Sequence, residues 1–334
     1  MGVIGGLYEP DMVVDLGTAN THVLVKGYGI VLSEPSVVAV NTKTDEIVAV
    51  GLAAKDVMGR APANVVATRP LEGGVITDFK ATEEMLSSFF RRARRARGAP
   101  RYLVRPRAAV CVPWEATAVE LWAVKKAVES AGARKAHTVK VSLAAAVGAG
   151  LPVNEPEGSM VVDVGGGTTE VAVISLGEVV SGTSLRVAGD DIDYAIATHV
   201  QKEHRTILTS QSVEWLKIEL GSVLPLSEEV AAEVRGHDPA TQLPKSAVVT
   251  SEEVRKALSE PVKAIVGAVH DTLDRTPPEL VSDLMDRGMT LAGGGALLGG
   301  LDVHLWRETS VPVRVAEEPL TCIVIGGGRL LEKP

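Results

Sequence analysis

The sequence predicts an α/β protein built from two similar domains, and two short motifs carry this prediction. The segments Asp15–Thr21 and Asp163–Thr169 share the spacing Asp-x-Gly-x-x-x-Thr, and each follows a β-branched run. The 334 residues include only 3% aromatic residues, while Val, Ala, Leu and Gly dominate, which suits parallel sheets covered by helices. We therefore expect two sheet-containing domains that offer their loops to one shared ligand.

Each motif is expected to lie in a β-hairpin. Residues 12–14 enter the first loop and residues 21–25 leave it, whereas residues 160–162 and 171–175 do the same for the second. The two units are offset by 148 residues. This offset indicates an internal duplication of the chain.

The segments between and after the hairpins alternate in type. Apolar periodicity predicts a helix at about 82–97, a strand at 108–113, and a helix at about 115–131 that stops at Gly132. The second half repeats the alternation, with helices expected near 190–204, 211–220, 251–275, 278–287 and 297–308. Thr250 and Glu253 form a capping-box pattern, and Pro261 is expected to kink or divide the helix that follows.

Composition excludes several classes of protein. A net charge of −8 disfavours non-specific nucleic-acid binding by the whole surface. The two cysteines, Cys111 and Cys322, lie in apolar runs, which indicates buried reduced thiols in a cytosolic protein rather than disulfides or a zinc site. The N-terminal residues lack the pattern of a signal peptide, and no apolar run reaches the ~18 residues of a spanning helix.

The paired loops predict a site for a nucleotide and its divalent cation. Asp15 and Asp163 end apolar strands, and two carboxylates flanking a polyphosphate suit Mg²⁺. The alternative is that each aspartate only caps a turn. Glycine lets backbone N–H groups approach phosphate oxygens, and hydroxyl or amide side chains add donors; the candidates are Gly17, Gly165, Gly166, Gly167, Thr18, Asn20, Thr21, Thr168 and Thr169.

A third glycine-rich element spans residues 291–297, between a short apolar run and a predicted helix. Backbone without side chains offers a flat surface to a purine ring and its ribose. A structural turn explains the same residues equally well.

The order of these motifs resembles the superfamily of actin, Hsp70 and the sugar kinases. Asp-Leu-Gly-Thr-Ala-Asn-Thr, Asp-Val-Gly-Gly-Gly-Thr-Thr-Glu-Val and Ala-Gly-Gly-Gly-Ala-Leu-Leu occur in that order. Within the superfamily the chain resembles the bacterial MreB/Mbl actin-like proteins from about residue 11 onward. Further family-like stretches lie at 29–39, 144–152, 217–222 and 319–322.

The resemblance implies an actin-like, ribonuclease H-like fold of two duplicated domains, with the nucleotide in the interdomain cleft. Domain I would comprise 1–150 and 319–334, with a small subdomain at about 30–80. Domain II would comprise 151–318, with a small subdomain at about 186–255.

The resemblance also implies the ligand contacts. ATP phosphates and Mg²⁺ would lie at the loops 15–21, which include Ala19, and 163–169. The adenosine would contact Glu214, Lys217 and the turn Gly293, Gly294, Gly295 and Ala296. From the residues alone, Glu214 and Lys217 read as a solvated helix face with an i,i+3 pair of opposite charges.

One departure from the family bears on catalysis. MreB-like proteins carry Glu-Glu-Pro before the Ala-Ala-Ala run, and the second Glu helps to position the attacking water; here the segment reads Lys140-Val141-Ser142. Val141 has no proton acceptor, whereas Thr168, which matches a family residue that also touches the water, is retained. We therefore expect hydrolysis to be weak or lost.

A basic run with an apolar insertion is the second informative feature. It contains Arg91, Arg92, Arg94, Arg95, Arg97, Arg101, Arg105 and Arg107, and Tyr102-Leu103-Val104 interrupts it. Apolar residues flanked by arginines suit insertion into an anionic bilayer surface, and MreB-like proteins use a hydrophobic loop in this region. A solvated helix end is the ordinary alternative, and nucleic acid is disfavoured because no further aromatic residue is interleaved.

Taken together, the expectations describe an ATP-binding cytoskeletal protein that is cytoplasmic and peripheral on the inner face of the cell membrane. It would form head-to-tail filaments with itself, work with membrane proteins of cell elongation and wall synthesis, and direct rod shape. The main rival is a non-hydrolysing regulatory paralogue that co-assembles with a true filament former. A chaperone ATPase would need a peptide-binding domain after Pro334, and a small-molecule kinase would need a base and a substrate insert that the sequence does not show.

Overall fold

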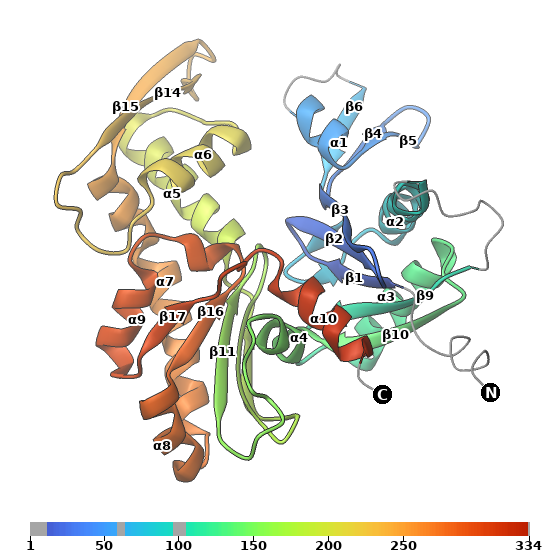
Figure 1. The fold of residues 1–334 in the computed structure, drawn as a ribbon. Coiled ribbons are helices and arrows are strands. Elements are labelled where there is room, and N and C mark those ends of the chain that lie inside the picture. Colours follow the sequence, from blue (N-terminus) through green and yellow to red (C-terminus); the bar gives the residue numbers. More distant parts are fainter. Residues whose placement is uncertain (1–11, 59–63, 96–104, 333–334) are drawn as a thin grey trace.

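Two five-stranded sheets form the centre of the molecule (Figure 1). The computed structural model describes residues 12–58, 64–95 and 105–332. In the first sheet the strand order is β10 (Lys135–Lys140), β9 (Arg107–Val112), β1 (Met12–Leu16), β2 (Asn20–Val25) and β3 (Gly29–Pro35). In the second it is β17 (Val313–Val315), β16 (Met289–Ala292), β11 (Ser159–Val164), β12 (Thr169–Ser175) and β13 (Glu178–Leu185).

The two sheets have the same topology. The central strand β1 is antiparallel to β2 and parallel to β9, and β11 is antiparallel to β12 and parallel to β16. Asp15 stands opposite His22 in the first hairpin, and Asp163 stands opposite Glu170 in the second. Both pairs keep the offset of 148 residues, so the predicted duplication is confirmed. We call the parts built on the two sheets the first and the second domain.

Helices and small sheets complete the first domain. Helices α2 (Phe79–Arg95) and α3 (Ala118–Ser130) enclose a core with the first sheet, centred on Phe89 and Phe90. A small unit above it contains β4 (Val38–Asn41), β5 (Glu46–Val50), α1 (Leu52–Val57) and β6 (Val65–Thr68). The two-residue strands β7 (Leu71–Glu72) and β8 (Val75–Ile76) form a hairpin after it.

Five of the described α-helices belong to the second domain. They are α5 (Gly189–His204), α6 (Ser210–Leu220), α7 (Ser251–Asp274), α8 (Pro278–Arg287) and α9 (Leu301–Thr309), with the 3₁₀ turn η2 (Gly294–Leu297) before α9. A two-stranded sheet of β14 (Ala231–His237) and β15 (Pro244–Thr250) extends from this domain (Figure 1). Helix α7 begins with the predicted capping box of Thr250 and Glu253, but it runs unbroken through the buried Pro261. The expected division at that proline is therefore wrong, because tertiary packing stabilises the helix across the lost hydrogen bond.

Helices α4 (Val141–Gly148) and α10 (Cys322–Glu332) pack against each other between the sheets. Their backbones are in close contact: a Cβ on Gly148 would lie 1.9 Å from the Cys322 carbonyl oxygen, and one on Gly326 would lie 1.8 Å from that of Ala144. Glycine is therefore required at both positions.

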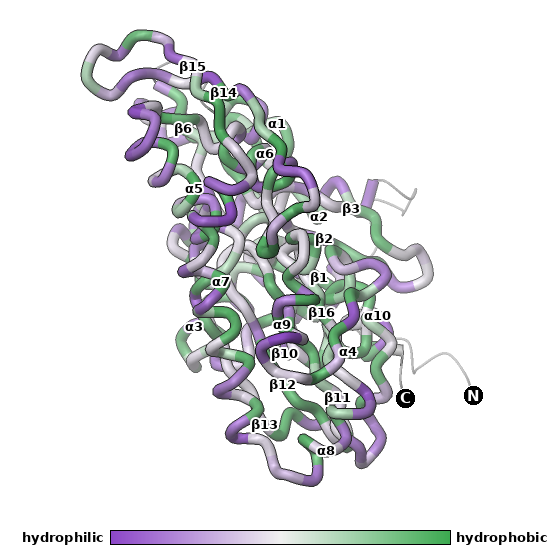
Figure 2. Tube along the Cα trace, turned by 90° about the vertical axis from the view of Figure 1, so that its left-hand side faces the viewer, coloured by the Kyte–Doolittle hydropathy of each residue, from purple (hydrophilic) through white to green (hydrophobic). Residues whose placement is uncertain are grey.

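The strands that lead to the two loops are buried on both faces. All residues of β1, β9, β11 and β12 are buried, which agrees with their largely apolar sequences, and apolar colour is frequent around β1 and β2 in Figure 2. Within the described residues, we find no helix that combines the length and apolarity needed to cross a bilayer. The boundaries of the domains and subdomains stay a prediction.

Candidate functional site

The two predicted phosphate loops lie against each other. Each closes with the same backbone hydrogen bond, from Gly17 N–H to Asn20 O (3.1 Å) and from Gly165 N–H to Thr168 O (2.9 Å). A Cβ on Gly166 would lie 2.7 Å from the Ala19 Cβ, so this contact requires glycine. The structure thus brings together two loops that are 148 residues apart in the chain.

The two aspartates near the strand ends are buried, and neither forms an ion pair with a residue that the structure describes. Asp15 is 8% exposed and Asp163 is 2% exposed, and Asp163 Oδ1 has no hydrogen-bond partner among the described residues. Burial raises the pKa of Asp15 to about 7. Burial, with the nearby Asp15 and Glu170 carboxylates, raises the pKa of Asp163 to about 8. Both carboxylates would be stabilised by a bound cation.

Several hydroxyls at the loops form hydrogen bonds within the protein. The Thr21 and Ser36 hydroxyls are hydrogen-bonded to each other (2.8 Å), and Ser36 also donates to Gly17 O (2.6 Å). The Thr169 hydroxyl donates to Val187 O (2.7 Å), and Thr18 Oγ1 accepts from Gly74 N–H (3.1 Å). The loop backbone N–H groups, rather than these side chains, are therefore the main candidates to bind phosphate.

Thr168 borders a cavity of about 230 Å³ beside the second loop. Gly74 and Thr117 line it from the first domain, and Ser184 and Arg186 line it from the second. A Cβ on Gly74 would lie 2.9 Å from the Thr168 Cγ2 atom, so this hairpin also packs on the loop.

The third glycine element packs on the strand that carries Asp163. A Cβ on Gly293 would lie 2.3 Å from Val164 O and 2.8 Å from Asp163 Oδ1, and Gly293 has a φ of 77°. A Cβ on Gly295 would lie 2.3 Å from Val164 Cγ1. Close packing thus explains two of these glycines without a ligand, and it places the predicted Gly293–Ala296 turn next to the second phosphate loop.

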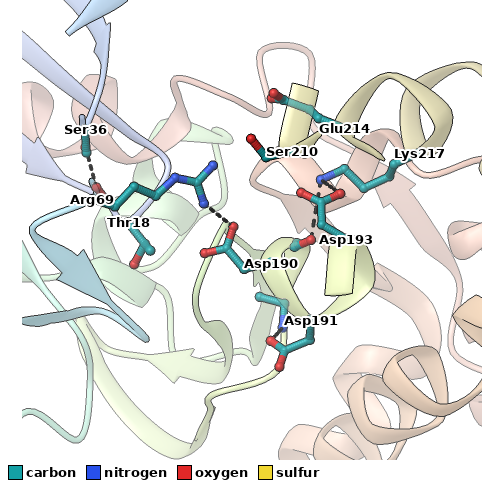
Figure 3. Close-up of polar contacts among 12 residues, drawn as sticks. Thr18, Ser36, Arg69, Asp190, Asp191, Asp193, Ser210, Glu214 and Lys217 are labelled. Atoms are coloured by element: carbon teal, nitrogen blue, oxygen red, sulfur yellow. Dashed lines mark hydrogen bonds and ion pairs between the residues drawn. The ribbon is translucent and has the colours of Figure 1, made fainter. Parts of the chain in front are cut away.

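Glu214 and Lys217 lie on α6 and both bind partners outside their own helix. Figure 3 shows the contact of Lys217 with Asp193. Lys55 Nζ lies 2.7 Å from Glu214 Oε2, and Lys217 Nζ lies 2.9 Å from Asp193 Oδ1 and 3.4 Å from Gly189 O. They do not form the i,i+3 pair that their spacing suggests.

Ion pairs connect the two domains on this side. Besides the Lys55–Glu214 pair, Arg69 Nη1 lies 2.5 Å from Asp190 Oδ1 (Figure 3). A cavity of about 460 Å³ lies beside these contacts, lined by Met58 of the first domain and by Gln211 and Trp215 of the second. No local sequence pattern predicts these pairs, because the partners are more than 120 residues apart in the chain.

Val141 is the first residue of α4, and it packs partly buried among apolar residues such as Val13 and Val324. Lys140 precedes it as the N-cap, and its Nζ lies 4.0 Å from the centroid of the Trp114 ring. No side chain caps the helix. The structure therefore places an apolar group, with no acceptor, where the resemblance implies a glutamate.

The predicted membrane residues Tyr102, Leu103 and Val104 lie outside the described part of the chain. Of the arginines around them, Arg107 is buried in β9 with 6% exposure, so it belongs to the fold rather than to a basic surface. Arg92 is half exposed and forms an ion pair with Glu34. Insertion of the Tyr102-Leu103-Val104 segment into an anionic surface stays a prediction.

Comparison with known proteins decides the family. The family model described as MreB/Mbl protein matches residues 9–334. The chain belongs to the MreB/Mbl family. It is 47% identical to the cell shape-determining protein MreB of Escherichia coli strain K12, over 98% of this chain and 94% of that protein. It is 43% identical to the cell shape-determining protein Mbl of Bacillus subtilis, over 98% and 97% of the two chains.

Solved MreB structures share the fold. MreB5 of Spiroplasma citri bound to ADP superimposes with a TM-score of 0.90 at 33% identity, covering 97% of this chain and 96% of that one. The same protein bound to AMPPNP gives 0.90 at 32% identity. The predicted actin-like fold class is therefore confirmed, and this MreB/Mbl chain is an actin-like member of a family of cell shape-determining proteins.

Proposed function

We propose that this MreB/Mbl chain binds ATP between its two domains and uses the bound nucleotide to assemble head-to-tail filaments. The observation that carries the proposal is the pair of equivalent loops, each with a buried carboxylate, meeting at one place. The nucleotide-bound MreB5 structures support it, because their fold matches over nearly the whole chain.

Mg²⁺ fits the residues at this place. Asp163 Oδ1 is buried without a hydrogen-bond partner among the described residues, and both aspartates have raised pKa values. Both features are expected of carboxylates that bind a cation. No group of three or more acidic, His or Cys side chains that could hold a metal occurs among the described residues, so phosphate oxygens and water would complete the coordination. When bound, the ion would neutralise phosphate charge.

The adenosine would lie against α6 and the Gly293–Ala296 turn. Glu214 and Lys217 would contact it, and the Lys55–Glu214 pair would then rearrange or cover the bound nucleoside. Closure of the two domains on the nucleotide would make the opposite ends of the folded molecule complementary. A repeated end-to-end contact between molecules would then extend into a filament.

The proposed role is a cytoskeleton on the inner face of the cell membrane that directs wall synthesis and rod shape. Tyr102, Leu103 and Val104 would insert into the anionic bilayer surface. Flotation with anionic liposomes tests this part: we expect the full chain to bind, and the Leu103→Ser, Val104→Ser double variant to bind less. If the unchanged chain did not bind the liposomes, the proposed membrane association would be refuted.

A second candidate function is a regulatory paralogue that binds ATP and co-assembles without turnover. Val141, which has no acceptor, favours it. Chaperone and small-molecule kinase functions have no comparable observation in their favour.

Sedimentation and electron microscopy of the purified chain with ATP, with ADP and without nucleotide test the proposal, with phosphate release measured in parallel. Filaments with ATP and little phosphate release are the expected result. Filaments independent of nucleotide, or none under any condition, would contradict autonomous ATP-driven assembly. Assembly only after addition of a second MreB-type chain would favour the paralogue.

A further inference from the structure

A buried contact joins the two domains directly behind the second phosphate loop. Glu170 is the second residue of β12 and is 1% exposed. Its Oε2 atom accepts a hydrogen bond from the Trp114 backbone N–H (3.0 Å), and Trp114 lies in the segment between β9 and α3 of the first domain. Its Oε1 atom accepts from the Ser184 hydroxyl (2.5 Å) on the neighbouring strand β13.

Burying a carboxylate at such a place costs free energy, because the charged group loses its hydration. Burial raises the pKa of Glu170 to about 6 despite its two hydrogen-bond donors. An apolar side chain would fill the space without this penalty. The carboxylate is therefore best explained by the bond that it makes to the other domain.

The Trp114 ring contacts residues of both domains. Lys140 Nζ lies 4.0 Å from the ring centroid, and Lys140 is the N-cap residue of α4, which begins with Val141. Gly182 of β13 leaves room for the indole, since a Cβ there would lie 3.2 Å from Trp114 Nε1. Trp114 thus contacts the start of α4 as well as the second domain.

The contact is also close to the ligand site. Glu170 stands directly opposite Asp163 and is two residues from Thr168. Because β12 is paired along its length with β11 and β13, a shift of Glu170 shifts the loop that precedes it.

We propose that Glu170 is a positioning residue that fixes the second phosphate loop relative to the first domain by holding the Trp114 backbone N–H. The Glu170–Trp114 hydrogen bond therefore couples the angle between the two domains to the geometry of the second phosphate loop. The inference deepens the proposed nucleotide function, and it predicts that removing the carboxylate loosens the interdomain angle even without nucleotide.

Distances between one spin label on the β4–β5 turn and another on the β14–β15 turn test the proposal. Lys43 and Ala240 are exposed, lie on different domains and can be replaced by cysteine for labelling, whereas both native cysteines are buried. We expect Glu170→Leu to broaden the distance distribution of the nucleotide-free protein, and Glu170→Gln, which can accept from Trp114 and donate to Ser184, to restore it. The control is Arg186→Ala, which removes the exposed Arg186–Glu120 ion pair between the same domains and should leave the distribution narrow.

Trp114→Ala provides a second route if Glu170→Leu does not fold. It keeps the backbone N–H but removes the ring whose contacts with Lys140 and Gly182 position that N–H against Glu170, so it should broaden the distribution as well. An unchanged distribution in the folded Glu170→Leu variant, or equal broadening in Arg186→Ala, would overturn the proposal. ATP titrations of the same variants keep the two proposals distinct: no ATP binding by the unchanged chain would refute the nucleotide function, while the nucleotide-free distances would still decide the role of Glu170.

Discussion

Val141 is the residue on which the expectation of slow hydrolysis depends. It lies at the start of α4 with an apolar side chain, and its neighbour Lys140 is turned to Trp114. We predict that Val141→Glu raises single-turnover phosphate release by about 10- to 100-fold, since a positioned carboxylate orients water and accepts a proton. Val141→Leu is the matched control and should change nothing. Equal rates in all three proteins would show that hydrolysis does not depend on this position.

The two buried aspartates predict how stability depends on pH. Their folded pKa values of about 7 and about 8 exceed the ordinary value of 3.8, so the folded protein holds these protons more tightly than the unfolded chain. Their contribution to stability is therefore greatest below about pH 4 and is lost as the pH rises towards about 8.

Denaturant unfolding of the nucleotide-free protein at several pH values measures this effect. We expect the free energy of unfolding to fall with rising pH over that window, and the slope to be shallower in the Asp15→Asn, Asp163→Asn double variant. MgATP should also reduce the slope, because the cation replaces the protons. A slope that is the same with and without the aspartates would contradict the assignment.

At the scale of elements, the contact between α4 and α10 depends on two glycines. A Cβ on Gly326 would lie 1.8 Å from the Ala144 carbonyl oxygen, so the helices must separate to accept it. We predict that Gly326→Ala lowers the free energy of unfolding by on the order of 1–3 kcal/mol. Gly267 on α7 has open space around it, and Gly267→Ala should instead raise stability by about 0.5–1 kcal/mol. Similar losses for both variants in thermal and denaturant unfolding would refute this account of the contact.

The elements that the sequence predicted well are those with a strong local pattern. The hairpins around both loops, helix α2 and the capping box of α7 follow directly from apolar runs, periodicity and Thr250–Glu253. Helix α4 was not predicted, because its Ala-rich sequence has almost no polar face and it is buried between the two sheets. Helix α10 has three consecutive glycines, which argue against a helix locally and become favourable only through close packing.

For the candidate site, the motifs predicted the loops, the aspartates and their proximity. The sequence could not predict that the Thr21 and Thr169 hydroxyls form hydrogen bonds within the protein. Nor could it predict the Lys55–Glu214 and Glu170–Trp114 contacts. These contacts join residues that are distant in the chain, and their geometry is set by the packing of two domains.

At the scale of the whole molecule, duplication leaves two equivalent loops that meet at one place. The sheets share one topology, Asp15 corresponds to Asp163, and the loops touch at Ala19 and Gly166. A single polyphosphate bound by both halves would explain why both carboxylates are buried. Two independent sites would not require the loops to meet.

The stoichiometry of MgATP binding tests this central claim most directly. Calorimetric titration of the full chain should give one nucleotide per chain, and Asp15→Asn and Asp163→Asn should each weaken that one binding event by at least about 10-fold, because each removes a charge-assisted contact from a shared site. Two nucleotides per chain, or a single variant that loses one site and leaves another unchanged, would contradict it.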